Sequence, residues 1–167
     1  MRTISRVLAG AVLLWMGTAN AWANGRGGAA SGSNASVFKA ADELAAAVRS
    51  RNVEAILLFV APDGVPCIDA TVSRKDVEKQ LRTHGTWLNA YFLEPDAFKH
   101  KFADGLTPMS FAEFLATARD LRVTMPAKQH PRFPCVTFAA SNIEFRASFC
   151  FRRYGHRWVL GDLPNCG

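Results

Sequence analysis

The chain lacks the short motifs by which many enzymes and cofactor-binding proteins are recognised. Its 167 residues contain no G-x-S-x-G nucleophile turn, no H-E-x-x-H zinc motif and no glycine-rich phosphate loop. The four cysteines include no C-x-x-C pair, and the four histidines show no metal-ligand spacing. No apolar run approaches the roughly 18–20 residues of a membrane span. We therefore expect no cofactor, no metal site and no membrane-spanning segment.

The first 23 residues have the pattern of a secretory signal peptide. Arg2 and Arg6 supply a positive start, about ten apolar residues follow, and a small-x-small cleavage site ends at Ala23. Residues 24–35 are rich in Gly and Ser, the composition of a flexible leader, which argues against the alternative of a buried first helix. We expect export, cleavage after Ala23, and a soluble periplasmic or secreted product.

Removal of this signal lowers the net charge. The whole chain has 20 basic and 14 acidic residues, and the signal holds two arginines and no acid, so the product carries 18 against 14, or +4. A charge of this size does not require a nucleic-acid partner, and an exported protein rarely meets nucleic acid. We expect no nucleic-acid partner.

Four cysteines lie beyond the signal: Cys67, Cys135, Cys150 and Cys166. An even number in an exported chain predicts two disulfide bonds. A metal site and a catalytic thiol are the weaker alternatives, because neither a ligand spacing nor a Cys–His signature accompanies any of the four. Three pairings are possible, and cysteine counting does not choose among them.

Residues 36–167 are predicted to form one α+β domain that begins with helices. Capping residues predict helix starts at Ser36, Asn52, Ser73 and Ser110, and apolar residues follow each at steps of three and four. The apolar run at 87–93 fits a strand or a helix equally well, since short runs do not discriminate.

The last third has the alternation of an antiparallel β-meander. Residues 134–140 and 143–153 can pair across a two-residue turn, and a second hairpin turns at 155–156. The outward face is polar and carries Cys135 diagonal to Cys150, within reach of a disulfide. All inward positions are apolar: Val136, Phe138, Ile143, Phe145, Ala147, Phe149 and Phe151. We expect helices packed on one face of a curved antiparallel sheet.

Two segments resemble NTF2-like (SnoaL-like, cystatin-like) domains. Residues 52–64, Asn-Val-Glu-Ala-Ile-Leu-Leu-Phe-Val-Ala-Pro-Asp-Gly, are similar to the family's second short helix and the turn after it. Residues 149–160, Phe-Cys-Phe-Arg-Arg-Tyr-Gly-His-Arg-Trp-Val-Leu, are similar to its last hairpin. The resemblance is confined to the N-terminal helices and this hairpin, and it implies a cone with a pocket between sheet and helices. Residues 84–132 depart from the family pattern.

The resemblance also implies a disulfide pairing. The family's sheet places the early hairpin beside the last strand, so Cys67 is expected near Cys166. Cys135 is then left for Cys150, which agrees with their diagonal position in the predicted meander.

Enzymes of this family that resemble ketosteroid isomerase use an inward Asp base and a Tyr donor. Asp162 is the one acid that the predicted register turns inward, opposite Phe149, which makes it the candidate general base. The alternative is a paired or solvated carboxylate at the frayed end of the strand. Trp87 and Tyr91 can line a pocket mouth, or they can belong to an ordinary core.

Positive charge is concentrated on the last hairpin. Arg152 and Arg153 lie beside Trp158 there, with three more basic residues: Arg146, His156 and Arg157. This surface suits an acidic partner protein or an envelope polyanion, and its alternative is the solvated face of a half-buried sheet. Because arginines and a disulfide occupy the outer sheet face, we expect a monomer.

Two functions remain. The first is a non-catalytic exported binding module, similar to an immunity or inhibitor protein, that holds a small apolar ligand or an envelope partner protein. The second is a small pocket enzyme of the isomerase or dehydratase type with Asp162 as general base. An enzyme needs an inward carboxylate and a donor converging in a cavity, whereas an interior filled with touching aromatic rings excludes it.

Overall fold

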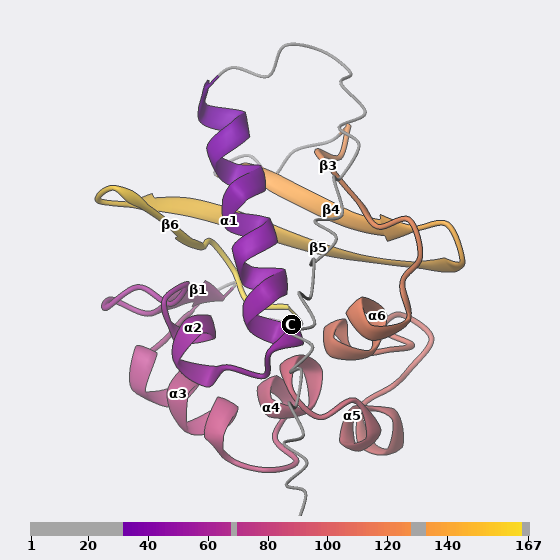
Figure 1. Ribbon diagram of the computed structural model, residues 1–167. Helices are drawn as coiled ribbons and strands as arrows, with labels where there is room; N and C mark the ends of the chain where they lie inside the picture. Colours follow the sequence, from indigo (N-terminus) through magenta and orange to yellow (C-terminus); the bar gives the residue numbers. More distant parts are fainter. Residues whose placement is uncertain (1–31, 68–69, 128–132, 165–167) are drawn as a thin grey trace, which may run out of the picture.

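A computed structural model describes residues 32–67, 70–127 and 133–164 of the protein. The predicted signal peptide and Cys166 lie outside the described residues. The fold is α+β, as predicted: helices form the N-terminal part and an antiparallel four-stranded sheet the C-terminal part. Helix α1 lies across the sheet, and the other helices gather below it in the view of Figure 1.

Helix α1 (Gly32–Arg49) begins four residues before the predicted cap at Ser36. Residues 32–35, which the sequence assigned to the leader, are therefore helical, and Ser36 lies inside the helix. The buried face of the helix includes the predicted apolar positions and several alanines, which let the helix approach its neighbours closely. Its members are Val37, Ala40, Ala41, Leu44, Ala45, Ala47 and Val48.

Helix α2 (Val53–Leu57) starts at the predicted Asn52 cap, whose side chain accepts a hydrogen bond from the Ala55 amide at 3.0 Å. Strands β1 (Val65–Cys67) and β2 (Ala70–Val72) then form a small antiparallel hairpin. The turn before β1 requires glycine, because Gly64 has a φ of +91° and a Cβ there would lie 2.3 Å from the Val72 carbonyl oxygen.

The middle of the chain is helical. Helix α3 (Arg74–Arg82) starts at the predicted Ser73 cap, and the apolar run of uncertain type forms α4 (Trp87–Phe92). Helix α5 (Pro95–Lys101) follows with a proline in its first turn. Helix α6 (Phe111–Thr117) begins at the predicted Ser110, whose hydroxyl accepts a hydrogen bond from Glu113.

The main sheet has the order β3-β4-β5-β6 and is antiparallel throughout. Its edge strand β3 (Arg122–Thr124) is not predicted by the sequence. Strands β4 (Cys135–Ala140), β5 (Ile143–Tyr154) and β6 (Arg157–Leu160) form the predicted meander. The second hairpin has the expected register, with Gly155 at a φ of +58° in its turn.

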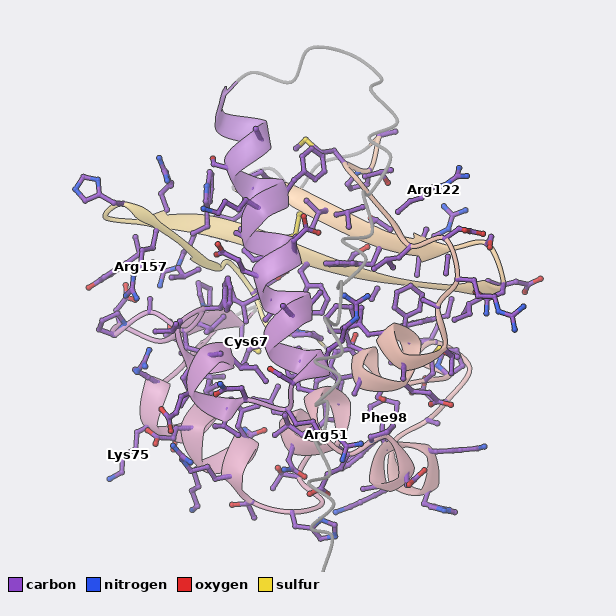
Figure 2. All side chains as sticks on the ribbon, viewed as in Figure 1. Arg51, Cys67, Lys75, Phe98, Arg122 and Arg157 are labelled. Carbon is purple, nitrogen blue, oxygen red and sulfur yellow. A yellow bond between two sulfur atoms is a disulfide. The ribbon has the colours of Figure 1, made fainter. Side chains whose placement is uncertain are left out.

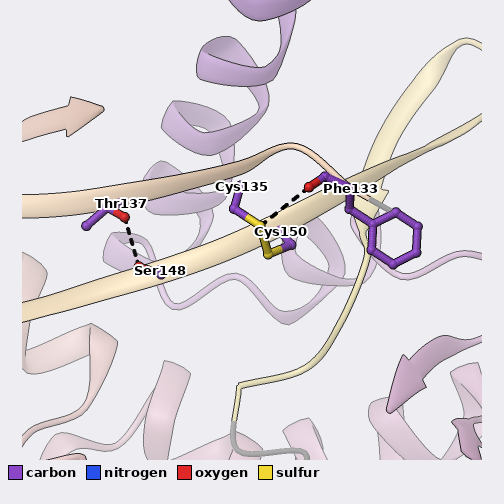
Figure 3. The surroundings of a disulfide bond; sticks show 5 residues. All are labelled: Phe133, Cys135, Thr137, Ser148 and Cys150. Carbon is purple, nitrogen blue, oxygen red and sulfur yellow. Dashed lines mark hydrogen bonds between the residues drawn. A yellow bond between two sulfur atoms is a disulfide. The ribbon is translucent and has the colours of Figure 1, made fainter. Parts of the chain in front are cut away.

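The first hairpin contains a register shift that the sequence does not predict. A uniform register places Phe138 opposite Phe145, but Phe138 lies opposite Ala147. The shift is by two residues, so every side chain keeps its predicted face. It also brings Cys135 directly opposite Cys150, and the predicted disulfide between them is present (Figure 3). Cys67 is likewise disulfide-bonded, and its predicted partner lies outside the described residues.

Aromatic rings fill the space between the helices and the sheet. The Phe111 ring centroid lies 4.6 Å from that of Phe149 and 5.0 Å from that of Phe138. The Phe92 ring packs edge-on against Phe111, and its centroid lies 6.1 Å from that of Phe149. Of the predicted inward positions of the meander, only Ile143 and Phe145 are less than fully buried. The core therefore consists of touching rings from helices and sheet.

Candidate binding groove

A groove with a volume of about 480 Å³ lies between α1, α2 and the β5–β6 hairpin. Three segments distant in the sequence form it: residues 36–43 of α1, the residues around the end of α2, and the turn of the last hairpin. Its size falls within the range of roughly 300–1,000 Å³ found for small-ligand sites.

Trp158 is held in a fixed position at the floor of the groove. Its indole N–H donates a hydrogen bond to the Ser36 hydroxyl at 2.9 Å. The Arg153 guanidinium, from the opposite position on β5, lies over the Trp158 ring at 4.8 Å from its centroid. Arg153 also donates to the His156 carbonyl oxygen at 3.3 Å. These contacts orient an aromatic ring and a cation together before any ligand arrives.

The rest of the floor is apolar and includes one exposed leucine side chain. Leu58 follows α2 and is 55% exposed, whereas Ile56 and Leu57 beside it are buried in the core. Phe59 and Ala55 also line the groove here. A leucine exposed to this degree next to an aromatic floor provides apolar surface that a ligand can cover.

The rim is basic. Lys39, Arg153, His156 and Arg157 face one acid, Glu43, and Lys39 is paired with that acid at 3.7 Å. Arg157 is exposed on the last hairpin (Figure 2). Within the described residues, neither Arg153 nor Arg157 has a carboxylate within salt-bridge distance. Two arginines without an acidic partner beside apolar surface favour an anion that also carries an apolar group.

Arg152, which the sequence grouped with the binding residues, has a different position. Its guanidinium donates to the Asp63 carboxylate at 2.6 and 3.3 Å and to the Gly64 carbonyl oxygen at 3.0 Å. These hydrogen bonds hold the pKa of Asp63 below its usual value. The residue is only 18% exposed. Arg152 thus joins the meander to the turn before β1 and does not line the groove.

Trp87 and Tyr91 lie on α4, and neither lines the groove. Their rings stack at 4.6 Å, and Tyr91 also packs at 5.6 Å from Phe98. Tyr91 is 3% exposed, and this burial raises the pKa of its phenol. Both rings thus pack against core residues and do not border the groove.

Asp162 follows β6 and is partly buried. The β5–β6 register ends at the Phe151–Leu160 pair, and Phe149 pairs with Val136 instead. The predicted register pairs Asp162 with Phe149, but the β5–β6 pairing does not reach that far. Strand pairing between β5 and β6 thus ends at Leu160, two residues before Asp162.

No protein-family model, curated protein or solved structure matches the chain. Across the ranges described, no helix is both long and apolar enough to cross a membrane. The same residues contain no group of three or more His, Cys, Asp or Glu side chains positioned to hold a metal ion.

The structure brings together two of the five predicted binding residues, Arg153 and Trp158. The sequence does not predict the contributions of Lys39 and Leu58. A signal for Leu58 exists, because a single helical face cannot bury all three consecutive apolar residues 56–58. Lys39 resembles any other solvated residue on α1 and gives no such signal.

Proposed function

We propose that the protein is an exported, non-catalytic binding module whose groove holds an anionic partner with an apolar part. The observation that carries this proposal is the pairing of Trp158 with Arg153 over an apolar floor that includes the exposed Leu58. The signal-like N-terminus and the disulfide bonds support export.

Binding is favoured over a pocket reaction for two reasons. The rings around Phe111 occupy the interior where the family's enzymes would place a substrate. The candidate base Asp162 lies beyond the last strand pair, so the strand register does not fix the direction of its carboxylate. An NTF2-like relationship is part of the proposal, supported by the succession of two helices, a small hairpin, further helices and a closing meander.

The test compares capture of envelope components by three forms of the immobilised protein. The groove variant carries Arg153→Glu and Arg157→Glu, and the control carries Arg122→Glu and Arg146→Glu on exposed positions of β3 and β5. Both variants change the charge equally, so general electrostatics affect them alike.

We expect wild type and control to retain the same acidic protein or small anion, and the groove variant to lose it. Native mass spectrometry of the freshly purified protein detects a small ligand that co-purifies. Equal retention by all three forms, or by none, contradicts the proposal.

A further inference from the structure

We infer that the occupant of the groove is an extended acidic peptide segment that adds a strand to the free edge of β6. The inference rests on the proposed function and names its ligand class. Its starting point is the backbone of Trp158, whose side chain already forms the floor of the groove.

The phase of the hairpin hydrogen bonds directs the Trp158 backbone away from β5. A two-residue turn makes the flanking pair Tyr154–Arg157 hydrogen-bonded, so the next pair, Arg153–Trp158, is not. Two observed bonds confirm this phase. The Gly161 amide donates toward β5, to the Cys150 carbonyl oxygen at 2.8 Å. The Leu160 amide donates away from β5, to the Phe59 carbonyl oxygen at 2.8 Å. Trp158, two residues before Leu160, therefore directs its N–H and C=O outward as well.

This edge is closed at one end and open beside the groove. Phe59 covers it at Leu160. Two residues before Leu160, Trp158 lies among residues that line the groove, which include Leu58 and Phe59. In the part of the chain that the structure describes, the outward N–H and C=O of Trp158 have no hydrogen-bond partner. An open strand edge that borders an apolar groove is the surface to which extended peptides add.

A peptide can use the open strand edge, the apolar floor and the basic rim at once. One residue of an added strand supplies both the acceptor and the donor that the Trp158 backbone lacks. Apolar side chains can cover Leu58, and acidic ones can reach Arg153 and Arg157. A fatty acid or another small anion would pair with the arginines but leave the strand edge unsatisfied. The charge of the rim and the chemistry of the edge therefore agree on an acidic peptide.

The probe is the peptide Ac-Glu-Leu-Glu-Leu-Glu-NH2. It is titrated against the protein expressed with its own N-terminal segment and purified after any cleavage, and binding is followed by Trp fluorescence and calorimetry. In a strand, alternate residues direct their amides to opposite edges. N-methylation of all three Glu amides or of both Leu amides therefore blocks one edge at a time. We expect one methylated peptide to bind about tenfold more weakly or worse, because it loses a backbone hydrogen bond and gains a clash. The other should stay within about twofold of the parent, since its blocked edge faces away.

The protein variants test the charge. Arg153→Glu with Arg157→Glu should weaken the parent peptide by about tenfold or more, and the control pair Arg122→Glu with Arg146→Glu should not. The inference is overturned if the parent peptide fails to bind, if the two methylated peptides behave alike, or if the corresponding Lys-Leu peptide binds as well.

Dodecanoate separates failure of the inference from failure of the proposed function. If dodecanoate binds through Arg153 and Arg157 and the peptide does not, the ligand class is wrong while the groove remains a binding site for anions. If neither binds and the extracts also yield no partner, the proposed function fails as well.

Discussion

The indole N–H of Trp158 on β6 donates to the hydroxyl of Ser36 on α1, at 2.9 Å and across 122 positions of sequence. The bond links the last hairpin to the first helix. It fixes the aromatic floor of the groove, and with it the Arg153 guanidinium that lies over the ring. This contact between the two ends of the domain therefore helps to set the shape of the groove.

Loss of the Trp158–Ser36 hydrogen bond should lower the stability of the fold. Ser36→Ala leaves the partly buried Trp158 indole without its hydroxyl partner, so we expect a loss of about 1 kcal/mol in the free energy of unfolding. Ser50→Ala, which removes a local bond at 3.0 Å to the Ala47 carbonyl oxygen near the end of α1, is the control and should cost less. Urea unfolding measures both. Equal losses would show that the Trp158 contact has no special importance.

The Asp63–Arg152 pair makes stability depend on pH. Hydrogen bonding to Arg152 lowers the pKa of Asp63 in the folded protein. A lowered folded-state pKa stabilises the protein above the unfolded value of about 3.9, and the benefit is lost as the pH falls through the folded value. Asp63→Asn should therefore be less stable than wild type at pH 7, with the difference shrinking in acid. Urea midpoints from pH 7 downward measure this, and a difference that stays constant argues against the assignment.

The aromatic core should dominate stability. Phe111→Ala removes the ring that contacts Phe149 and Phe138, and we expect a cost of about 3–5 kcal/mol. Leu106→Ala, at a position that is 91% exposed, should change the free energy of unfolding by less than about 0.5 kcal/mol. If the two substitutions cost the same in chemical denaturation, the interior is not packed as described.

Two glycines with positive φ separate backbone strain from steric clash. Gly85 has a φ of +69°, and a Cβ added there would have no atom within 4 Å, so Gly85→Ala should cost about 1–2 kcal/mol from backbone strain alone. Gly64 has a φ of +91°, and a Cβ there would lie 2.3 Å from the Val72 carbonyl oxygen, so Gly64→Ala should cost clearly more. Thermal unfolding of both variants checks the order, and the reverse order contradicts the geometry of the β1–β2 turn.

Local signals predicted much of the fold. Side chains at Asn52, Ser73 and Ser110 accept hydrogen bonds from amides three residues on, so the helix starts that they predict are confirmed. Alternation likewise predicted the faces of the meander. Local rules failed at Ser36, where the helix begins earlier and the hydroxyl binds Trp158 instead of capping. They also missed the two-residue register shift at Phe138, which depends on pairing across the sheet.

The groove was harder to predict because it is a tertiary feature. Arg153 and Trp158 share one hairpin, so their pairing follows from the register. Lys39 and Leu58 reach the same groove from other elements, and no periodicity relates them to the hairpin. Arg152 shows the opposite effect, because its neighbours in sequence suggest a binding surface while its contact is with Asp63.

The central claim is that ligands bind in the groove at Trp158 and not among the rings of the core. The most direct measurement is the indole N–H resonance of Trp158 during titration with the Glu-Leu peptide, assigned with a Trp158→Phe variant. We expect a progressive shift of this resonance, while the resonance of the Trp87 indole, whose ring stacks at 4.6 Å on that of Tyr91, stays unchanged. A shift confined to Trp87, or to ring protons of Phe111 and Phe149, would contradict this claim.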